Sequence, residues 1–307
     1  MLRSAAALAA GGLAIAALCV AAEPGARGDA IDTPRIVGGA FAYGAQRGDS
    51  LASVSARFGV DVPVLARANG LASDDRLALG QRLAIANPHL VPPITGSDAV
   101  VVNIPQRMLF QARAGALLGA YPVAAGRPSW RTPRGEFAID ERAVDKTWIV
   151  PASIQEELRR EGKRVRTEVP PGPDNPLGRH WLGLSRTSCG IHGTIAPTSI
   201  YALRTHGCIR LHPDDIARVF ERAALGDRVR LIYEPVLLAT LPDGRVCLEA
   251  HRDAYALAPN GEAELARLAE LKGVHGRADA QLAREALAAR DGIAVDVTLG
   301  SAGGPCT

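Results

Sequence analysis

Residues 190–194 of the 307-residue chain read Gly-Ile-His-Gly-Thr, and residues 205–211 read Thr-His-Gly-Cys-Ile-Arg-Leu. The chain has seven histidines, yet two of them, His192 and His206, lie in these runs close to Cys208. A thiol becomes a nucleophile when a base takes its proton and the backbone leaves room for the substrate, so a Gly-Cys step with nearby histidines meets both needs. The residues alone leave a second interpretation open, because a cysteine between apolar neighbours is more often an inert core residue.

Strand and turn patterns surround these two runs. Residues 100–103 are Val-Val-Val-Asn, and residues 107–114 and 117–124 form two apolar stretches around a turn, which predicts a hairpin. One amphipathic helix is expected over residues 214–224. With 32 glycines, 21 prolines and 4% aromatic residues, the composition favours a β-rich protein with many turns.

Further motifs extend the pattern outward. Residues 132–137 read Thr-Pro-Arg-Gly-Glu-Phe, residues 175–178 read Asn-Pro-Leu-Gly, and Trp181-Leu182 follow. Together with the runs that hold His192 and Cys208, these motifs resemble those of the L,D-transpeptidases. The resemblance covers residues 99–234 and implies a mainly β catalytic domain, an L,D-transpeptidase-like β-sandwich with short helices.

The resemblance also implies the catalytic roles. Cys208 would be the nucleophile and His192 the general base that later returns the proton. The carbonyl of Gly193 would orient the imidazole of His192, as an Asp does in a serine triad.

A second set of residues would hold the substrate or its oxyanion: Thr205, His206, Gly207 and Arg210. Gly207 would leave space for the substrate, and Arg210 would meet a substrate carboxylate through its planar fork. Two alternatives stay open. His206 is equally interpretable as a structural histidine, and Arg210 as half of an internal ion pair with Asp214 or Asp215.

The implied reaction is acyl transfer on peptidoglycan tetrapeptide stems through a cysteine thioester. It would release D-Ala and then form 3→3 cross-links or attach a protein, such as a lipoprotein or an outer-membrane protein, to the wall. No cofactor and no metal are implied. The alternatives are an L,D-carboxypeptidase or other hydrolase of the same fold and a non-catalytic wall-binding protein.

Residues 41–86 have a different pattern, in which strand, helix, helix and strand follow one another. A helix is expected over residues 51–58 with Gly59 as its stop, and a second begins near Pro63. The stretch resembles a LysM module, a small αβ domain that binds glycans containing N-acetylglucosamine. The resemblance implies peptidoglycan binding in a groove beside the turn formed by Gly48, Asp49 and Ser50.

The remaining segments complete the domain organisation. Residues 1–22 have a positive start and an apolar run that predict a cleaved signal peptide and a periplasmic protein, with an uncleaved membrane anchor as the alternative. Residues 87–98 contain three prolines and are expected to form a stiff linker with little to bury. Residues 235–307 form a mixed α/β extension of unknown role.

Charge and cysteine content bound the rest. The formal charge is +3 and no block of like charges occurs, so nothing predicts a nucleic-acid partner.

The chain has five cysteines, of which Cys19 lies in the predicted signal peptide. If Cys208 is free, Cys247 and Cys306 can form a bridge that pins the C-terminal tail, and Cys189 is then left over, able to form an inhibitory disulfide with Cys208 if the fold brings them together. The oligomeric state is not predicted.

Overall fold

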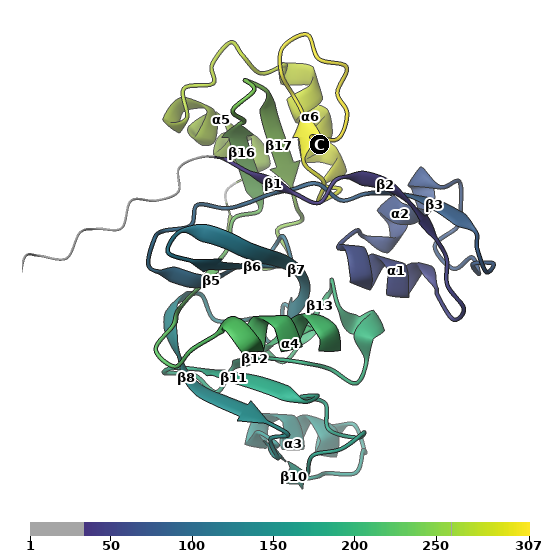
Figure 1. Ribbon diagram of the computed structural model, residues 1–307, viewed down its shortest axis with the longest axis vertical. Helices are drawn as coiled ribbons and strands as arrows, with labels where there is room; N and C mark the ends of the chain where they lie inside the picture. The colour runs from purple at the N-terminus through teal and green to yellow at the C-terminus, as the bar shows by residue number, and fades with distance from the viewer. Residues whose placement is uncertain (1–33, 259) are drawn as a thin grey trace, which may run out of the picture.

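The computed structural model describes residues 34–258 and 260–307, which form three parts: an N-terminal module, a central domain and a C-terminal unit (Figure 1). The N-terminal module lies to one side of this domain. The C-terminal unit lies at the opposite end of the molecule from helix α3. The predicted signal peptide lies outside the described residues.

Nine strands form the sheet of the central domain: β5 Asp98–Asn103, β6 Met108–Arg113, β7 Ala116–Gly126, β8 Gly135–Val144, β11 His180–Leu184, β12 Gly190–His192, β13 Leu203–Thr205, β14 Ile209–Leu211 and β15 Arg228–Ile232. Strand β7 pairs with β13, β14 and β6, so the sheet curls back on itself. The mainly β catalytic fold is therefore confirmed.

The core of the central domain lies inside this curved sheet. Leu109, Val123 and Leu182 are completely buried there, and helix α4 Pro213–Arg222 adds Ile216 and Val219. Burying such aliphatic side chains stabilises the fold by about 1.5–3 kcal/mol each. The predicted hairpin is β6 and β7, and the predicted amphipathic helix is α4.

The N-terminal module is built from β2 Ala40–Gly44, α1 Leu51–Phe58, α2 Val62–Ala68 and β3 Arg82–Ala86. The two strands pair antiparallel, and the helices bury Leu51, Val54 and Leu65 against them. Gly59 ends α1 in the left-handed conformation with φ +69°, which a glycine adopts without strain. The expected order of strand, helix, helix and strand is confirmed.

The C-terminal unit has its own small core. Strands β16 Val236–Thr240, β17 Val246–Ala250 and β18 Val295–Asp296 form a sheet that is covered by α5 Gly261–Leu271 and α6 Ala280–Ala289. Cys247 and Cys306 are joined by a buried disulfide, with 6.3 Å between their Cα atoms. The predicted bridge to the C-terminal tail is confirmed.

The expectation that residues 87–98 have little to bury is wrong. They contain β4 His89–Leu90, which pairs with β1 Ile36–Val37, and His89, Leu90 and Ile94 are 1–3% exposed. The segment therefore packs between the three parts of the molecule, where a free spacer was expected.

A buried carboxylate fixes this junction. Glu249 of β17 accepts hydrogen bonds from His89 Nδ1 at 2.8 Å and from the Leu90 amide at 2.6 Å. His89 Nε2 lies 3.0 Å from the carbonyl of Gly59, so both ring nitrogens of His89 face buried acceptors. Burial raises the pKa of Glu249, but the charge of His89 and the hydrogen bonds outweigh it and lower that pKa to about 2.

Four further elements complete the described structure. Strand β9 Trp148–Ile149 pairs with β10 Glu168–Val169, and α3 Ala152–Arg160 lies between them in the chain. The short 3-10 helix η1 Pro197–Ser199 lies in the connection from β12 to β13. Within residues 34–258 and 260–307, no helix is both long enough and apolar enough to cross a membrane.

Candidate active site

A cavity of about 360 Å³ lies between the central sheet and the β9–α3 segment. His192, Cys208 and Arg210 line it. Strands β12 and β14 run parallel with His192 opposite Arg210, and Cys208 lies two residues before Arg210. Side chains two residues apart on a strand point to the same face. The sheet register therefore directs the base candidate, the thiol and the guanidinium into one cavity.

His192 is held as a neutral base. Its ring is buried, and Nδ1 donates to the carbonyl of Gly193 at 2.7 Å. Burial and the charge of Arg210 lower the pKa of His192 to about 4, although backbone carbonyls act in the opposite direction. A neutral ring whose Nδ1 carries the proton leaves Nε2 with a lone pair that can accept one. Gly193 thus lies where its predicted role requires.

Cys208 shares its surroundings with a second thiol. A hydrogen bond between the two thiols lowers the pKa of Cys189 to about 7 and raises that of Cys208. The Gly190 amide and the charge of Arg210 act on Cys208 in the other direction and lower its pKa. Near neutral pH the thiolate of the pair is therefore favoured on Cys189, and the raised pKa of Cys208 means that a base must take the proton of Cys208 before it can attack.

The turn before Cys208 needs its glycine. Gly207 has φ +107°, a conformation that side chains strain, and its carbonyl accepts from Thr132 Oγ1 at 2.9 Å. Thr205 Oγ1 accepts from the Gly207 amide at 3.2 Å and donates to the Cys208 carbonyl at 2.6 Å. Thr205 therefore shapes the turn with its side chain, and the Gly207 amide is already occupied.

Arg210 lines the cavity, and one of its guanidinium nitrogens has no hydrogen-bond partner. Nη1 donates to Ser199 Oγ at 2.9 Å, and Nε is buried without a partner. The ion pairs of the described residues do not join Arg210 to Asp214 or Asp215, so the alternative of that internal pair is not borne out. An anionic group in the cavity would find a free donor there.

His206 bridges the turn to helix α3. Its Nε2 lies 2.5 Å from Glu157 Oε2, and Arg127 also binds this carboxylate. The ring packs edge-on against Trp130 with 4.9 Å between centroids. Hydrogen bonds from Arg127 and His206 lower the pKa of Glu157. Glu157, His206 and Arg127 therefore form a latch that holds helix α3 to the turn before Cys208.

The three tryptophans of the chain, Trp130, Trp148 and Trp181, all line this cavity. Trp181 stacks on His192 with 5.8 Å between ring centroids, and its indole passes over Gly190, where a Cβ atom would come within 2.5 Å. Only Trp181 was singled out from the sequence. The scarcity of aromatic residues is the signal that could have pointed to the other two.

The glycan-binding candidates of the N-terminal module stabilise their own turn. Asp49 Oδ2 accepts from the Tyr43 hydroxyl at 2.6 Å and from the Gln46 amide at 2.8 Å. Ser50 caps helix α1 by a reciprocal pair of hydrogen bonds with Ser53, and Gly48 has φ +89°. Their part in glycan binding stays a prediction.

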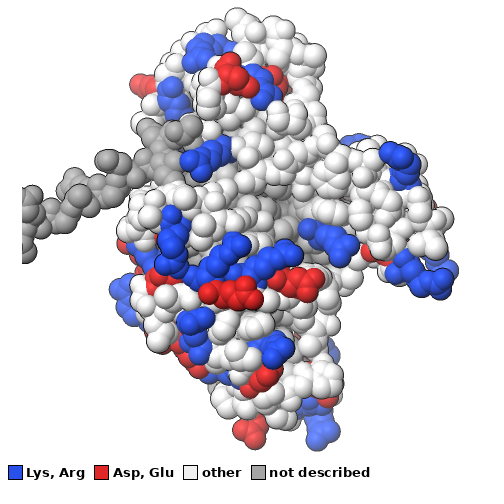
Figure 2. Space-filling model, in the orientation of Figure 1, with Lys and Arg blue, Asp and Glu red and all other residues white. Residues whose placement is uncertain are grey.

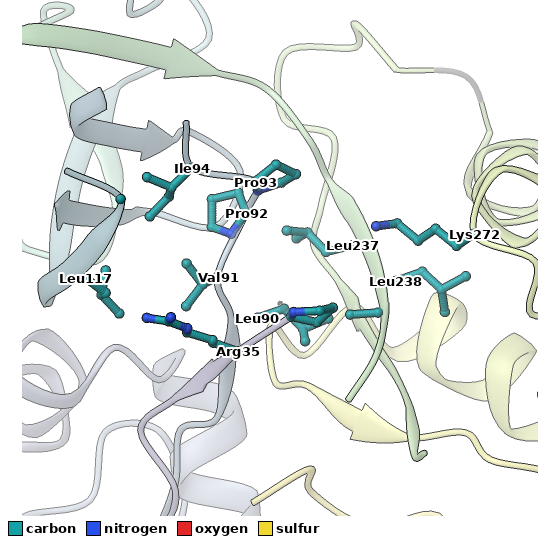
Figure 3. Close-up of a pocket in the computed structure, with 13 residues that line it drawn as sticks. Arg35, Leu90, Val91, Pro92, Pro93, Ile94, Leu117, Leu237, Leu238 and Lys272 are labelled. Atoms are coloured by element: carbon teal, nitrogen blue, oxygen red, sulfur yellow. The ribbon is translucent and has the colours of Figure 1, made fainter. Parts of the chain in front are cut away.

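Other surfaces lack this chemistry. A mainly apolar cavity where residues 90–94 meet the central domain and the C-terminal unit, shown in Figure 3, is lined by Leu90, Pro92 and Leu237 with Arg35 and Lys272 at its edges, and it contains neither thiol. On the face in Figure 2, basic and acidic side chains lie side by side across the middle of the molecule. No group of three or more His, Cys, Asp or Glu residues within 34–258 and 260–307 is arranged to hold a metal ion.

Comparison with known proteins gives two family matches. A model of the L,D-transpeptidase catalytic domain matches residues 97–231, and a model of the LysM domain matches residues 43–86.

Individual relatives match more of the chain. The probable L,D-transpeptidase ErfK/SrfK of Escherichia coli K12 is 30% identical over 259 residues, which cover 82% of this chain and 83% of the relative. The protein of the same name from Salmonella typhimurium is 34% identical over 203 residues, 66% of this chain and 65% of its own length. Among solved structures, an L,D-transpeptidase from Mycobacterium smegmatis is 19% identical with a TM-score of 0.34, and the match covers 68% of this chain and 96% of that one.

Proposed function

The chain belongs to the L,D-transpeptidase family and carries a LysM domain, and from this premise we propose that it transfers acyl groups within peptidoglycan through a thioester on Cys208. The observation that carries the proposal is the shared face of His192, Cys208 and Arg210 in one cavity. A nucleophile, a base and an anion-binding group are the three parts that acyl transfer to and from a carboxylate-bearing peptide needs.

In the first half-reaction, His192 Nε2 takes the proton of the Cys208 thiol, and the thiolate attacks the carbonyl of the third residue of a tetrapeptide stem. The Cys208 amide stabilises the oxyanion, because Gly207 has no side chain to block the approach. When the tetrahedral intermediate collapses, His192 returns its proton to the leaving amine. D-Ala departs and a thioester remains on Cys208.

Arg210 binds the carboxylate of the leaving D-Ala or of the stem. Its free Nε and the positive charge of Lys146, which also lines the cavity, support this assignment. The tryptophan walls exclude water and give the thioester time to meet an amine. In the second half-reaction that amine attacks the thioester, and His192 again takes the proton.

Peptidoglycan is the proposed partner of both domains, and the periplasm is the proposed location after removal of residues 1–22. The acceptor amine is the diaminopimelate of a second stem, which yields a 3→3 cross-link. A Lys side chain of a lipoprotein or an outer-membrane protein is the other acceptor.

The test uses purified protein and tetrapeptide muropeptides. Free D-Ala is measured, and products are identified by mass with diaminopimelate stems, a Lys peptide or water as the acceptor. Cys208→Ala and His192→Ala should each abolish D-Ala release by similar factors, because the two groups act as one unit. Glu285→Gln on the exposed face of α6 is the matched control. Turnover by Cys208→Ala would refute the thioester, and tripeptide formation without any amine adduct would assign the carboxypeptidase reaction.

A further inference from the structure

The cavity contains a thiol that the proposed reaction does not use. Cys189 lines the same wall as Cys208, and the two thiols are joined by a hydrogen bond. A Cβ atom built on Gly207, the residue before the nucleophile, would lie 3.2 Å from the Cys189 sulfur. Cys189 thus lies directly over the turn that presents Cys208.

The strand register explains this proximity. Ile191 lies opposite Ile209 in the parallel pair β12 and β14, so one residue earlier Gly190 lies opposite Cys208. Cys189 is the next residue back, so its Cα atom is offset by one residue from that of Cys208. Alternation along a strand would turn its side chain to the other face, but Cys189 precedes β12 and lines the same cavity as Cys208. Neighbouring strands are about 4.8 Å apart and residues rise about 3.3 Å, which gives a diagonal Cα separation of about 5.8 Å. This separation falls within the usual range for disulfides.

The other two cysteines of the described residues cannot compete. Cys247 and Cys306 are already bonded to each other and are completely buried in the C-terminal unit. Cys189 and Cys208 are both free and both partly exposed. Because thiolates are the form that peroxides oxidise, a thiol pair that ionises near neutral pH is also the reactive pair.

We propose that Cys189 is a resolving thiol that converts peroxide damage at Cys208 into a reversible disulfide. The inference deepens the proposed function and rests on it, since it assigns the partner that preserves the nucleophile. Without such a partner, a sulfenic acid can proceed to the sulfinic and sulfonic acids, which are not recovered by thiols.

The steps balance as follows in atoms and electrons. His192 first takes the proton of the Cys208 thiol, and the resulting thiolate attacks one oxygen of a hydroperoxide. The S–O bond forms as the O–O bond breaks, and the leaving oxygen takes the proton from His192 to give an alcohol or water. The Cys189 thiolate then attacks the Cys208 sulfur, and hydroxide leaves as water after taking a proton. A dithiol reductant restores both thiols by two exchange steps and becomes a disulfide itself.

The experiment treats the reduced full-length protein with limiting hydrogen peroxide and measures intact mass and unreduced peptide maps. The wild type should lose two hydrogen atoms and yield a peptide that links Cys189 to Cys208. Cys189→Ser should instead gain two or three oxygen atoms at Cys208, and its over-oxidised fraction should be several-fold larger. Dithiothreitol should recover both thiols in the wild type only.

Two controls keep the result decisive. The Cys247–Cys306 peptide should stay linked during the peroxide step and during mild reduction of the folded protein, because that disulfide is completely buried. Thermal melting should show that Cys189→Ser is folded, with Cys189→Ala as the substitute if it is not. Oxygen addition at Cys208 in the wild type, without a linked peptide, would overturn the proposal. These masses are independent of the D-Ala assay on the reduced protein, so failure of the proposed function would be seen separately.

Discussion

The guanidinium of Arg107 in the central domain donates two hydrogen bonds, of 2.6 and 2.9 Å, to the carboxylate of Asp61 in the LysM domain. The same guanidinium donates to the Tyr201 carbonyl at 3.2 Å and lies 4.0 Å over its ring. Tyr201 belongs to the connection between His192 and Cys208. Arg107 therefore links the LysM domain to the segment that joins His192 to Cys208.

Breaking this pair should loosen the LysM domain. Asp61→Asn leaves Arg107, whose side chain is 13% exposed, without its counter-charge, and we expect the free energy of unfolding to fall by about 1–3 kcal/mol. Turnover of soluble muropeptides should also slow, because the Tyr201 segment loses its support. Calorimetry and D-Ala release measure the two effects.

The exposed ion pair between Arg67 and Asp291 is the matched control, since it also joins the LysM domain to another part of the chain. Its arginine side chain is 61% exposed, so Arg67→Ala should change stability by less than about 1 kcal/mol. Equal effects of the two substitutions would contradict the importance assigned to Arg107.

The sequence could not predict this docking. The helices of the LysM domain were predictable because their apolar spacing and Gly59 are local signals. The contact between Asp61 and Arg107 joins residues 46 positions apart, and the interactions of Glu249 with His89 span 160. Three prolines in residues 87–98 suggested a spacer, but proline stiffness says nothing about what the neighbouring side chains bury.

The latch between Glu157 and His206 should control access to Cys208. Glu157→Ala removes the carboxylate that holds α3 to the nucleophile turn, so we expect a bulky maleimide to alkylate Cys208 several-fold faster. The reaction should be followed by mass on peptides, because Cys189 can also react.

Glu156→Ala is the control for this latch. Glu156 is the adjacent residue of α3, and its ion pair with Arg159 is exposed on both sides. The substitution Glu156→Ala should leave the alkylation rate of Cys208 unchanged. An unaltered rate in Glu157→Ala would show that α3 does not limit access.

The candidate site also has parts that the sequence predicts and parts that it does not, because local motifs are visible in a sequence and contacts between distant residues are not. His192, Gly193, Gly207, Cys208 and Arg210 lie in two short motifs from which the sequence predicts their roles, and strands β12 and β14 bring the two motifs together. Glu157, which binds His206, lies 49 positions before it in an ordinary amphipathic helix. Nothing local distinguishes its carboxylate from that of Glu156.

Removing the disulfide should destabilise the C-terminal unit. Cys247 and Cys306 are 59 residues apart, and closing a loop of that length is expected to contribute about 4 kcal/mol. Cys306→Ser should therefore lower the denaturant midpoint of this unit in non-reducing buffer. Reducing conditions should bring the wild type close to the variant, and a midpoint difference that persists in reductant would assign the loss to packing of the serine.

Acid should destabilise the protein partly through His192. Its pKa is about 4 in the folded state and 6.5 in the reference state, so below pH 6.5 the unfolded chain binds a proton that the folded chain refuses. The stability that His192 contributes is thus fully present above pH 6.5 and declines as the pH falls toward 4, by about 2–3 kcal/mol at pH 4.5.

His192→Gln should remove this part of the pH dependence of the free energy of unfolding when urea unfolding is measured at pH 7 and pH 4.5. His251, whose pKa burial also lowers, should keep a residual slope. The stability that Glu249 contributes is present above its unfolded pKa, near 4.5, and is lost as the pH falls below that value toward 2. His275→Gln on the exposed surface should retain the wild-type slope, because water reaches that ring in both states. An equal slope in wild type and His192→Gln would mean that His192 is charged in the folded protein, and it could not then accept the proton of Cys208.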